Sequence, residues 1–254
     1  MALNTNGVGR EIAIIKDNQK YKKTVISVND NDDDDKIIKP FQELHIDEGT
    51  FQYIPDTDRD RETIYICGSA GSGKSYWTGM FCKEYHKRHK NHPIYLISEG
   101  SADPALDNLA GLQRVKVDDS ILDEPIEWTE FSECLVIFDD IDAYTGKLKK
   151  YIYALLDKLL KNARKNKVSV IMTSHSCTGL ELKAVLNESD VIVFFMKNYN
   201  RSLKYLLESY VGLDKNGIKK LMKNKSRWTA FIKSFPNVIL QEKDIMTLTN
   251  IQDF

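Results

Sequence analysis

The chain has little of what would mark a secreted, membrane-spanning or zinc-binding protein. Its cysteines form no C-x-x-C pair and no zinc spacing, which favours reduced thiols packed as small apolar side chains. The longest apolar run, VIVFFM at 191–196, is too short to span a bilayer, and the N-terminus lacks the apolar stretch of a signal peptide. We therefore expect a soluble, intracellular protein without disulfides.

The chain also lacks an excess of charge of either sign. Lys and Arg total 36 against 37 Asp and Glu, which gives a formal net charge of −1. A local basic surface would therefore have to bind any polyanionic partner, because the molecule as a whole has no net positive charge to attract one. Lysine-rich stretches at 147–150, 158–167 and 215–225 are candidates, although runs of charge are usually solvated faces.

The sequence pattern divides the chain into two parts. Residues 1–60 are weakly patterned and contain the acidic run DNDDDDK at 30–36, which is typical of a solvated loop, so this N-terminal segment is expected to be partly disordered. The short apolar runs at 13–15 and 25–28 are interpreted as one or two edge strands of the main sheet. Residues 61–254 form the main predicted domain.

Within the main domain, five nearly unbroken apolar runs predict strands that are buried on both faces of a parallel sheet. These runs are ETIYIC at 62–67, IYLIS at 94–98, CLVIFDD at 134–140, VSVIMTS at 168–174 and VIVFFM at 191–196. Helical patterns lie between them, at 74–88, 149–166 and 180–186, and two further helices and a terminal hairpin are expected after residue 200. The fold class is therefore α/β, with a mainly parallel sheet covered by helices on both faces.

The stretch CGSAGSGKSYW at 67–77 fits the phosphate-binding pattern Gly-x-x-x-x-Gly-Lys-Ser. It follows a predicted strand and opens a predicted helix, so its N–H groups and the helix N-terminus should face one anion. Lys74 would reach the β- and γ-phosphates of a nucleotide, and the Ser75 hydroxyl would ligate Mg²⁺. The residues predicted to bind the nucleotide are Gly68, Ser69, Ala70, Gly71, Ser72, Gly73, Lys74, Ser75 and Tyr76.

Two further strands end in polar residues at the same edge of the predicted sheet. Asp139 and Asp140 close the run CLVIFDD, and we assign Asp139 to the water shell of Mg²⁺ and Asp140 to the attacking water. His175 follows VSVIMTS and is a candidate γ-phosphate sensor. The alternatives are that the Asp pair only caps a strand and that His175 is an ordinary loop histidine.

Two arginines are candidates for an arginine finger. Arg164 lies in the basic segment KNARKNK, and because Lys74 already supplies positive charge to its own site, Arg164 would act on the γ-phosphate of a neighbouring subunit. Arg201 is the second candidate. The simpler interpretation is that the basic residues are solvated and complement a helix C-terminus.

These motifs resemble the FtsK–HerA superfamily of ring-forming DNA-translocating ATPases, and within it the poxvirus-type genome-packaging ATPases of large DNA viruses and virophages. The resemblance rests on ICGSAGSGKS, ISEGSADPALDNL, LVIFDDI, NARKNKVSVIMTSH, YVGLDKNGIKKLMKNKSRW and FPNVIL, and covers roughly residues 62–248. It implies a RecA-like sheet with an additional strand. Arg164 matches the family's trans-acting arginine, His175 stands where cellular relatives have a sensor glutamine, and Asp140 where they commonly have glutamate.

The resemblance also implies a function. The chain would hydrolyse ATP with Mg²⁺ to move double-stranded DNA, packaging a viral genome as a homo-oligomeric ring of five or six subunits. Capsid proteins or membrane-associated virion proteins would be its partners, without insertion into a membrane. The host cytoplasm or a virus factory, or the virion itself, would be its location.

Three other functions compete with this interpretation. A P-loop kinase for a nucleotide or small molecule needs an acceptor pocket and an arginine-bearing lid, and no segment stands out as one. A GTPase needs the motifs N-K-x-D and D-x-x-G, and neither appears in its place. A non-motor assembly protein that only binds nucleotide would not need Asp140, His175 or the two arginines. ATP hydrolysis that rises with double-stranded DNA would separate the motor from all three.

Overall fold

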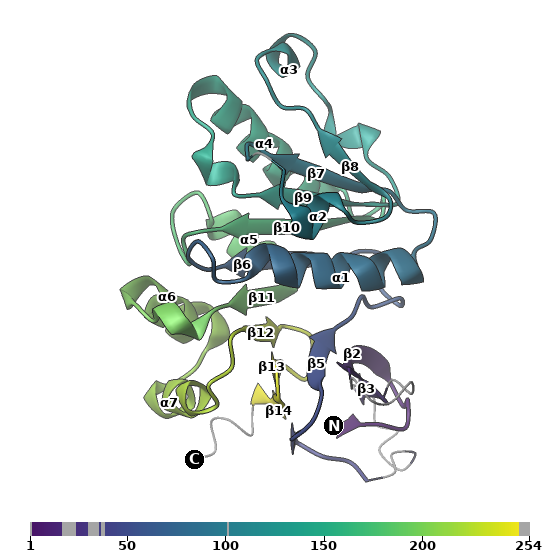
Figure 1. Ribbon diagram of the computed structural model, residues 1–254, viewed down its shortest axis with the longest axis vertical. Coiled ribbons are helices and arrows are strands. Elements are labelled where there is room, and N and C mark those ends of the chain that lie inside the picture. The colour runs from purple at the N-terminus through teal and green to yellow at the C-terminus, as the bar shows by residue number, and fades with distance from the viewer. Residues whose placement is uncertain (1, 17–23, 30–35, 37–38, 101, 249–254) are drawn as a thin grey trace. The chain divides into compact units, whose positions relative to one another are not determined.

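The computed structural model describes residues 2–16, 24–29, 36, 39–100 and 102–248 (Figure 1). The chain divides into two compact units, one of Arg59–Ile192 and one that combines Met1–Asp58 with Val193–Phe254. The sequence predicts a boundary between residues 60 and 61, with all later residues in one domain. The structural grouping differs because it joins the N-terminal segment with Val193–Phe254, and the predicted domains stay a prediction. Apart from Lys36, the acidic run at 30–36 lies outside the described residues.

The unit Arg59–Ile192 is built on parallel strands in the order β6-β10-β9-β7-β8. The strands are β6 (Thr63–Cys67), β7 (Ile94–Ser98), β8 (Leu112–Val115), β9 (Cys134–Asp139) and β10 (Val168–Ser174). Every residue of β6, β9 and β10 is buried, as their apolar sequences predict. The strand before the phosphate loop and the strand that ends in Asp139 are separated by β10, so the additional-strand order and the α/β fold class are confirmed.

Helices cover both faces of this sheet. Helix α1 (Lys74–Arg88) connects β6 to β7, and α4 (Gly146–Asn162) connects β9 to β10 in the opposite direction along the sheet. Because such crossovers are right-handed, the two helices lie on opposite faces, and Figure 1 shows α1 in front of the strands. Helix α5 (Lys183–Glu188) packs beside α4. The short helices α2 (Pro104–Asp107) and α3 (Ser120–Asp123) flank β8 in the chain.

Two predicted helices have different bounds in the structure. Helix α4 begins at Gly146 and ends at Asn162, whereas the pattern predicts 149–166. It stops early because the following residues form a turn in which the Lys167 N–H donates to the Arg164 carbonyl, and Lys167 has a φ of 55°, which a right-handed helix cannot contain. Helix α5 begins at Lys183 rather than at residue 180.

The other unit contains an antiparallel sheet that corrects one expectation. The apolar runs at 13–15 and 25–28 lie in β2 (Arg10–Lys16) and β3 (Thr24–Val28), which pair in a separate four-stranded sheet with β1 (Leu3–Asn4) and β5 (Thr50–Tyr53). They are not edge strands of the main sheet. Strand β2 pairs with β3 on one side and with β5 on the other. This antiparallel pairing satisfies the backbone hydrogen-bonding groups along both edges of β2.

The same unit also contains the predicted C-terminal hairpin. Strands β12 (Thr229–Ile232) and β13 (Val238–Gln241) pair antiparallel, as expected, and β14 (Asp244–Thr247) and β4 (Glu43–His45) extend them. Helix α6 (Arg201–Leu206), the π-helical turn Leu207–Val211 and α7 (Lys215–Lys223) precede the hairpin, where two helices are predicted. Strand β11 (Val191–Phe194) runs across the division between the units. None of the helices in the described ranges has the length and apolar character needed to cross a membrane.

Candidate nucleotide site

The phosphate loop connects the end of β6 to the start of α1. Gly71 and Gly73 have φ angles of 69° and 112°, a backbone region that other residues rarely adopt, so the glycines allow the loop to turn. The Gly68 N–H donates to the Ser174 carbonyl at 3.1 Å and anchors the loop to the end of β10. Residues 69–71 are exposed. The loop is therefore an open turn that leads directly into the N-terminus of a long helix, the arrangement that binds phosphate.

Lys74 is the centre of a compact polar cluster. Its side chain is 6% exposed, and its Nζ donates to the Gly68 carbonyl at 3.2 Å and lies 3.4 Å from Asp140 Oδ1. His175 Nδ1 is also 3.4 Å from this Nζ, and His175 Nε2 is 3.2 Å from Asp140 Oδ2. The structure thus brings together three predicted catalytic residues from three separate segments of the chain. A buried ammonium needs such partners, because burying an unpaired charge is costly.

Asp139 and Asp140 are both connected to β10 by one hydroxyl. Thr173 Oγ1 donates to Asp139 Oδ1 at 2.8 Å and accepts from the Asp140 N–H at 3.0 Å. Burial raises the pKa of Asp139, and the bond from Thr173 opposes that rise. Asp140 has a φ of 47°, a left-handed conformation that ends β9 and turns the chain into the following 3₁₀ turn. Thr173 thereby fixes the acidic pair relative to the strand that precedes His175.

Sequence reasoning missed the roles of Thr173 and Asp142. Thr173 lies within the predicted strand VSVIMTS at 168–174, and no sequence motif identifies Asp142. In the structure Ser174 Oγ donates to Asp142 Oδ2 at 3.3 Å, a second link between the β9 and β10 ends. The signal that could have identified Thr173 is a small hydroxyl residue inside a fully buried strand, where its oxygen must find a polar partner.

The loop fits a nucleotide's phosphates. The Ser72 hydroxyl is buried and has no hydrogen-bond partner among the residues that the structure describes, Ser75 is half-buried, and Tyr76 is 65% exposed beside the loop. Within the described ranges, no group of three or more His, Cys, Asp or Glu side chains could hold a metal ion. A Mg²⁺ ion bound to phosphates needs only one or two protein carboxylates, because it keeps several waters, so Ser75 and Asp139 suffice as candidates.

The two candidate arginines are not part of this cluster. Arg164 lies in the turn before β10, whereas His175 directly follows the other end of that strand, and a strand of 7 residues spans roughly 20 Å. The Arg164 side chain is 75% exposed, with its Nε 3.7 Å from Asp60 Oδ2. Arg201 is exposed and begins α6 in the other unit. Arg164 is therefore placed where it cannot reach the phosphate loop of its own chain.

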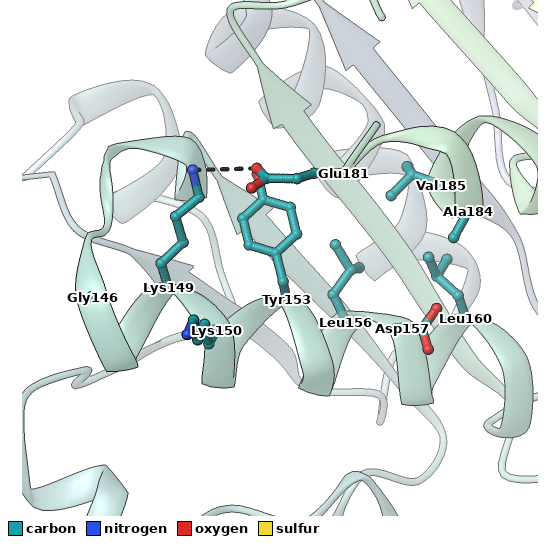
Figure 2. A pocket seen from close by; sticks show the side chains of 10 residues that line it. All are labelled: Gly146, Lys149, Lys150, Tyr153, Leu156, Asp157, Leu160, Glu181, Ala184 and Val185. Carbon is teal, nitrogen blue, oxygen red and sulfur yellow. Dashed lines mark ion pairs between the residues drawn. The ribbon is translucent and has the colours of Figure 1, made fainter. Parts of the chain in front are cut away.

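A groove with a volume of about 550 Å³ lies on α4 and the start of α5 (Figure 2). Leu156, Leu160 and Val185 form its apolar wall, and Lys149 Nζ pairs with Glu181 Oε2 at 3.2 Å at one end. None of the residues that line the groove is a predicted catalytic, nucleotide-binding or metal-binding residue, so the groove is separate from the phosphate loop, although Lys149 and Lys150 belong to the lysine-rich stretch 147–150.

The chain is similar in sequence to a virophage protein and in fold to viral packaging ATPases. No protein-family model matches it. Protein V3 of the Sputnik virophage is 32% identical over 234 residues, which cover 90% of this chain and 92% of V3. Among solved structures, the DNA-packaging ATPase B204 of Sulfolobus turreted icosahedral virus is similar with a TM-score of 0.50 and 17% identity, over 73% of this chain and 98% of B204.

The B204 genome-packaging NTPase of Sulfolobus turreted icosahedral virus 2, in complex with ATP-γS, has the same TM-score of 0.50 at 16% identity, over 72% of this chain and 98% of that chain. At such identities the likeness shows a shared fold. The similarity to V3 extends over nearly the whole of both chains. The chain therefore belongs to one family with the virophage protein V3 and shares the fold of the viral packaging ATPase B204.

Proposed function

We propose that the chain is an ATP-hydrolysing motor that translocates double-stranded DNA and packages a viral genome into a capsid. The observation that carries this proposal is the cluster of Lys74, Asp140 and His175 beside the phosphate loop. A protein that only binds nucleotide needs the loop and the lysine, but it does not need a carboxylate and an imidazole held at the same point. The fold shared with the DNA-packaging ATPase B204 supports the same function, and the similarity to the virophage protein V3 supports a viral setting.

Each residue of the cluster has one role in this mechanism. Lys74 and the loop N–H groups neutralise and orient the β- and γ-phosphates of ATP. Ser75 would ligate Mg²⁺ and Asp139 would hold its water shell, and the bound ion would supply positive charge to the phosphates. Asp140 orients the attacking water and accepts its proton. His175 contacts both Lys74 and Asp140, so it senses whether a γ-phosphate occupies the space beside them.

The contacts of Lys74 explain how the site changes when ATP enters. Here the Lys74 ammonium is balanced by the half-buried Asp140 carboxylate at 3.4 Å. Phosphate oxygens carry more negative charge and would take over as partners of Lys74, which releases Asp140 to face the water. The proton acceptor is then available only when nucleotide is bound.

Asp140→Asn should keep nucleotide binding but slow hydrolysis by about 10²–10⁴-fold, because it removes the proton acceptor and retains the shape of the side chain. The fold should be preserved, since asparagine tolerates the left-handed backbone found at this position. Binding is measured with a fluorescent ATP analogue and turnover by phosphate release, with the exposed Asp123→Asn as the control. Loss of binding in Asp140→Asn would instead make Asp140 a structural residue or a metal ligand.

The proposed substrate is double-stranded DNA, which a homo-oligomeric ring of five or six copies would bind and move along. With a net charge of −1, one chain has no strong global attraction for DNA, so a ring must gather local basic surfaces around a pore. Capsid or membrane-associated virion proteins are the proposed docking partners. The host cytoplasm or a virus factory is the proposed location.

The experiment that tests the proposal compares ATP turnover with and without linear double-stranded DNA. A rise in turnover supports the motor. Transfer of the γ-phosphate to a small acceptor would support the kinase alternative, and nucleotide binding without turnover would support the assembly protein.

A further inference from the structure

Two cysteine thiols meet where the phosphate loop begins. Cys67 is the last residue of β6, directly before Gly68, and is fully buried, whereas Cys177 follows β10 by three residues and is 8% exposed. Both are free thiols. A side-chain hydrogen bond from the Cys67 S–H to the Cys177 sulfur links the two residues.

The backbone around the two cysteines is held together by other contacts. Cys67 is the register partner of Ser174 in the parallel pair of β6 and β10, and the Gly68 N–H donates to the Ser174 carbonyl at 3.1 Å. The Tyr65 hydroxyl donates to the Ser176 carbonyl. The chain segments that carry Cys67 and Cys177 are therefore fixed beside each other, which is the condition for a disulfide to form without large rearrangement.

We propose that Cys67 and Cys177 are a redox modification site, at which hydrogen peroxide forms a reversible disulfide that disables the phosphate loop. The Cys177 thiolate attacks one peroxide oxygen and the O–O bond breaks, which gives a sulfenic acid and hydroxide. The Cys67 sulfur then displaces the sulfenic hydroxyl to form the S–S bond, and its proton leaves with hydroxide as water. Overall, two thiols and one peroxide give one disulfide and two waters.

Cys177 is the thiol that reacts first. It is the more exposed of the pair, and the hydrogen bond from Cys67 lowers the pKa of Cys177, which favours the nucleophilic thiolate. The same bond and burial raise the pKa of Cys67, which therefore stays protonated until the second step. The other two cysteines form the thiolate less readily than Cys177, because burial raises the pKa of Cys82 and of Cys134 to about 12. They serve as matched controls.

The disulfide would disturb the cluster around Lys74. Its formation requires the two sulfurs to move to about 2.05 Å from each other. Gly68, next to Cys67, and His175, two residues before Cys177, both contact Lys74 Nζ. Displacements of about 1 Å in such positions cost on the order of 10²-fold in rate, and we expect a loss of ATP turnover of that size. This part of the inference rests on the proposed function.

The test treats the full chain with hydrogen peroxide and maps disulfides by mass spectrometry of unreduced peptides. We expect a Cys67–Cys177 cross-link, loss of turnover, and recovery of both after reduction with dithiothreitol. Cys177→Ser should stay active in peroxide, whereas the double variant Cys82→Ser with Cys134→Ser should still be inactivated. Cys177→Ala replaces Cys177→Ser if thermal unfolding shows that the serine variant is misfolded.

The two proposals fail in different ways. Absence of the cross-link in peroxide-treated wild-type protein overturns the modification site, and so does a cross-linked protein with full turnover. If the reduced protein hydrolyses no ATP, the proposed function fails. The modification site is then judged by the cross-link and by binding of a fluorescent ATP analogue, which the disulfide should weaken and reduction should restore.

Discussion

Lys74→Ala is expected to abolish ATP hydrolysis, with a loss of about 10³-fold or more in turnover. No other cation lies in the described part of the loop, and the Lys74 ammonium is held by Gly68, Asp140 and His175 at the point where the β- and γ-phosphates would lie. Alanine leaves the loop's N–H groups in place but removes the charge that stabilises the leaving phosphate. The measurement is steady-state phosphate release at saturating ATP and Mg²⁺.

The matched control is Lys83→Ala, since Lys83 is an exposed lysine on the same helix, α1. This variant should retain wild-type turnover, and both variants should unfold near the wild-type temperature. Near-normal turnover in a folded Lys74→Ala protein would show that the phosphate loop is not the catalytic site.

Arg164→Ala is expected to bind ATP normally and to lose about 10³-fold or more in hydrolysis, as for an arginine finger. Arg164 is exposed and lies about a strand's length, roughly 20 Å, from the phosphate edge of its own sheet. Direct contact of Arg164 with a γ-phosphate must therefore be made in the active site of a neighbouring copy. Lys165→Ala is the matched control, because Lys165 is the next exposed cation in the same turn and should be dispensable.

Mixing two inactive variants tests this action in trans. Random co-assembly of Lys74→Ala with Arg164→Ala creates some interfaces that combine an intact phosphate loop with an intact arginine, so activity should return. If the variants co-assemble and activity does not return, Arg164 acts only through the fold, and Arg201 becomes the better candidate for the finger.

The central sheet and the edge that carries the site could be predicted from the sequence because each depends on local signals. Continuous apolar runs identify strands buried on both faces, and the polar residues that end them lie at one edge of a parallel sheet. Asp140 and His175 are predicted in this way and Lys74 by the phosphate-loop pattern, and the structure brings the three together. The fold class and the order of β6, β10 and β9 are confirmed.

Features that depend on long-range or exposed pairing were not predictable in the same way. Strand β8 is short and only partly buried, so its sequence LQRV has no continuous apolar run. The separate sheet of β2 and β3 looks, from sequence alone, like any pair of short edge strands. The link of Thr173 to both aspartates depends on the register of β9 and β10, which the apolar pattern does not specify when both faces are buried.

The central claim is that ATP hydrolysis beside Lys74 moves this chain along double-stranded DNA. Displacement of a third strand from a DNA triplex tests it most directly, because a motor that travels along the duplex removes the third strand in its path. We predict displacement by the wild-type protein with ATP and Mg²⁺, and none with a non-hydrolysable analogue or with Lys74→Ala. Full ATP turnover in the presence of the triplex, with the third strand remaining bound, would contradict the account.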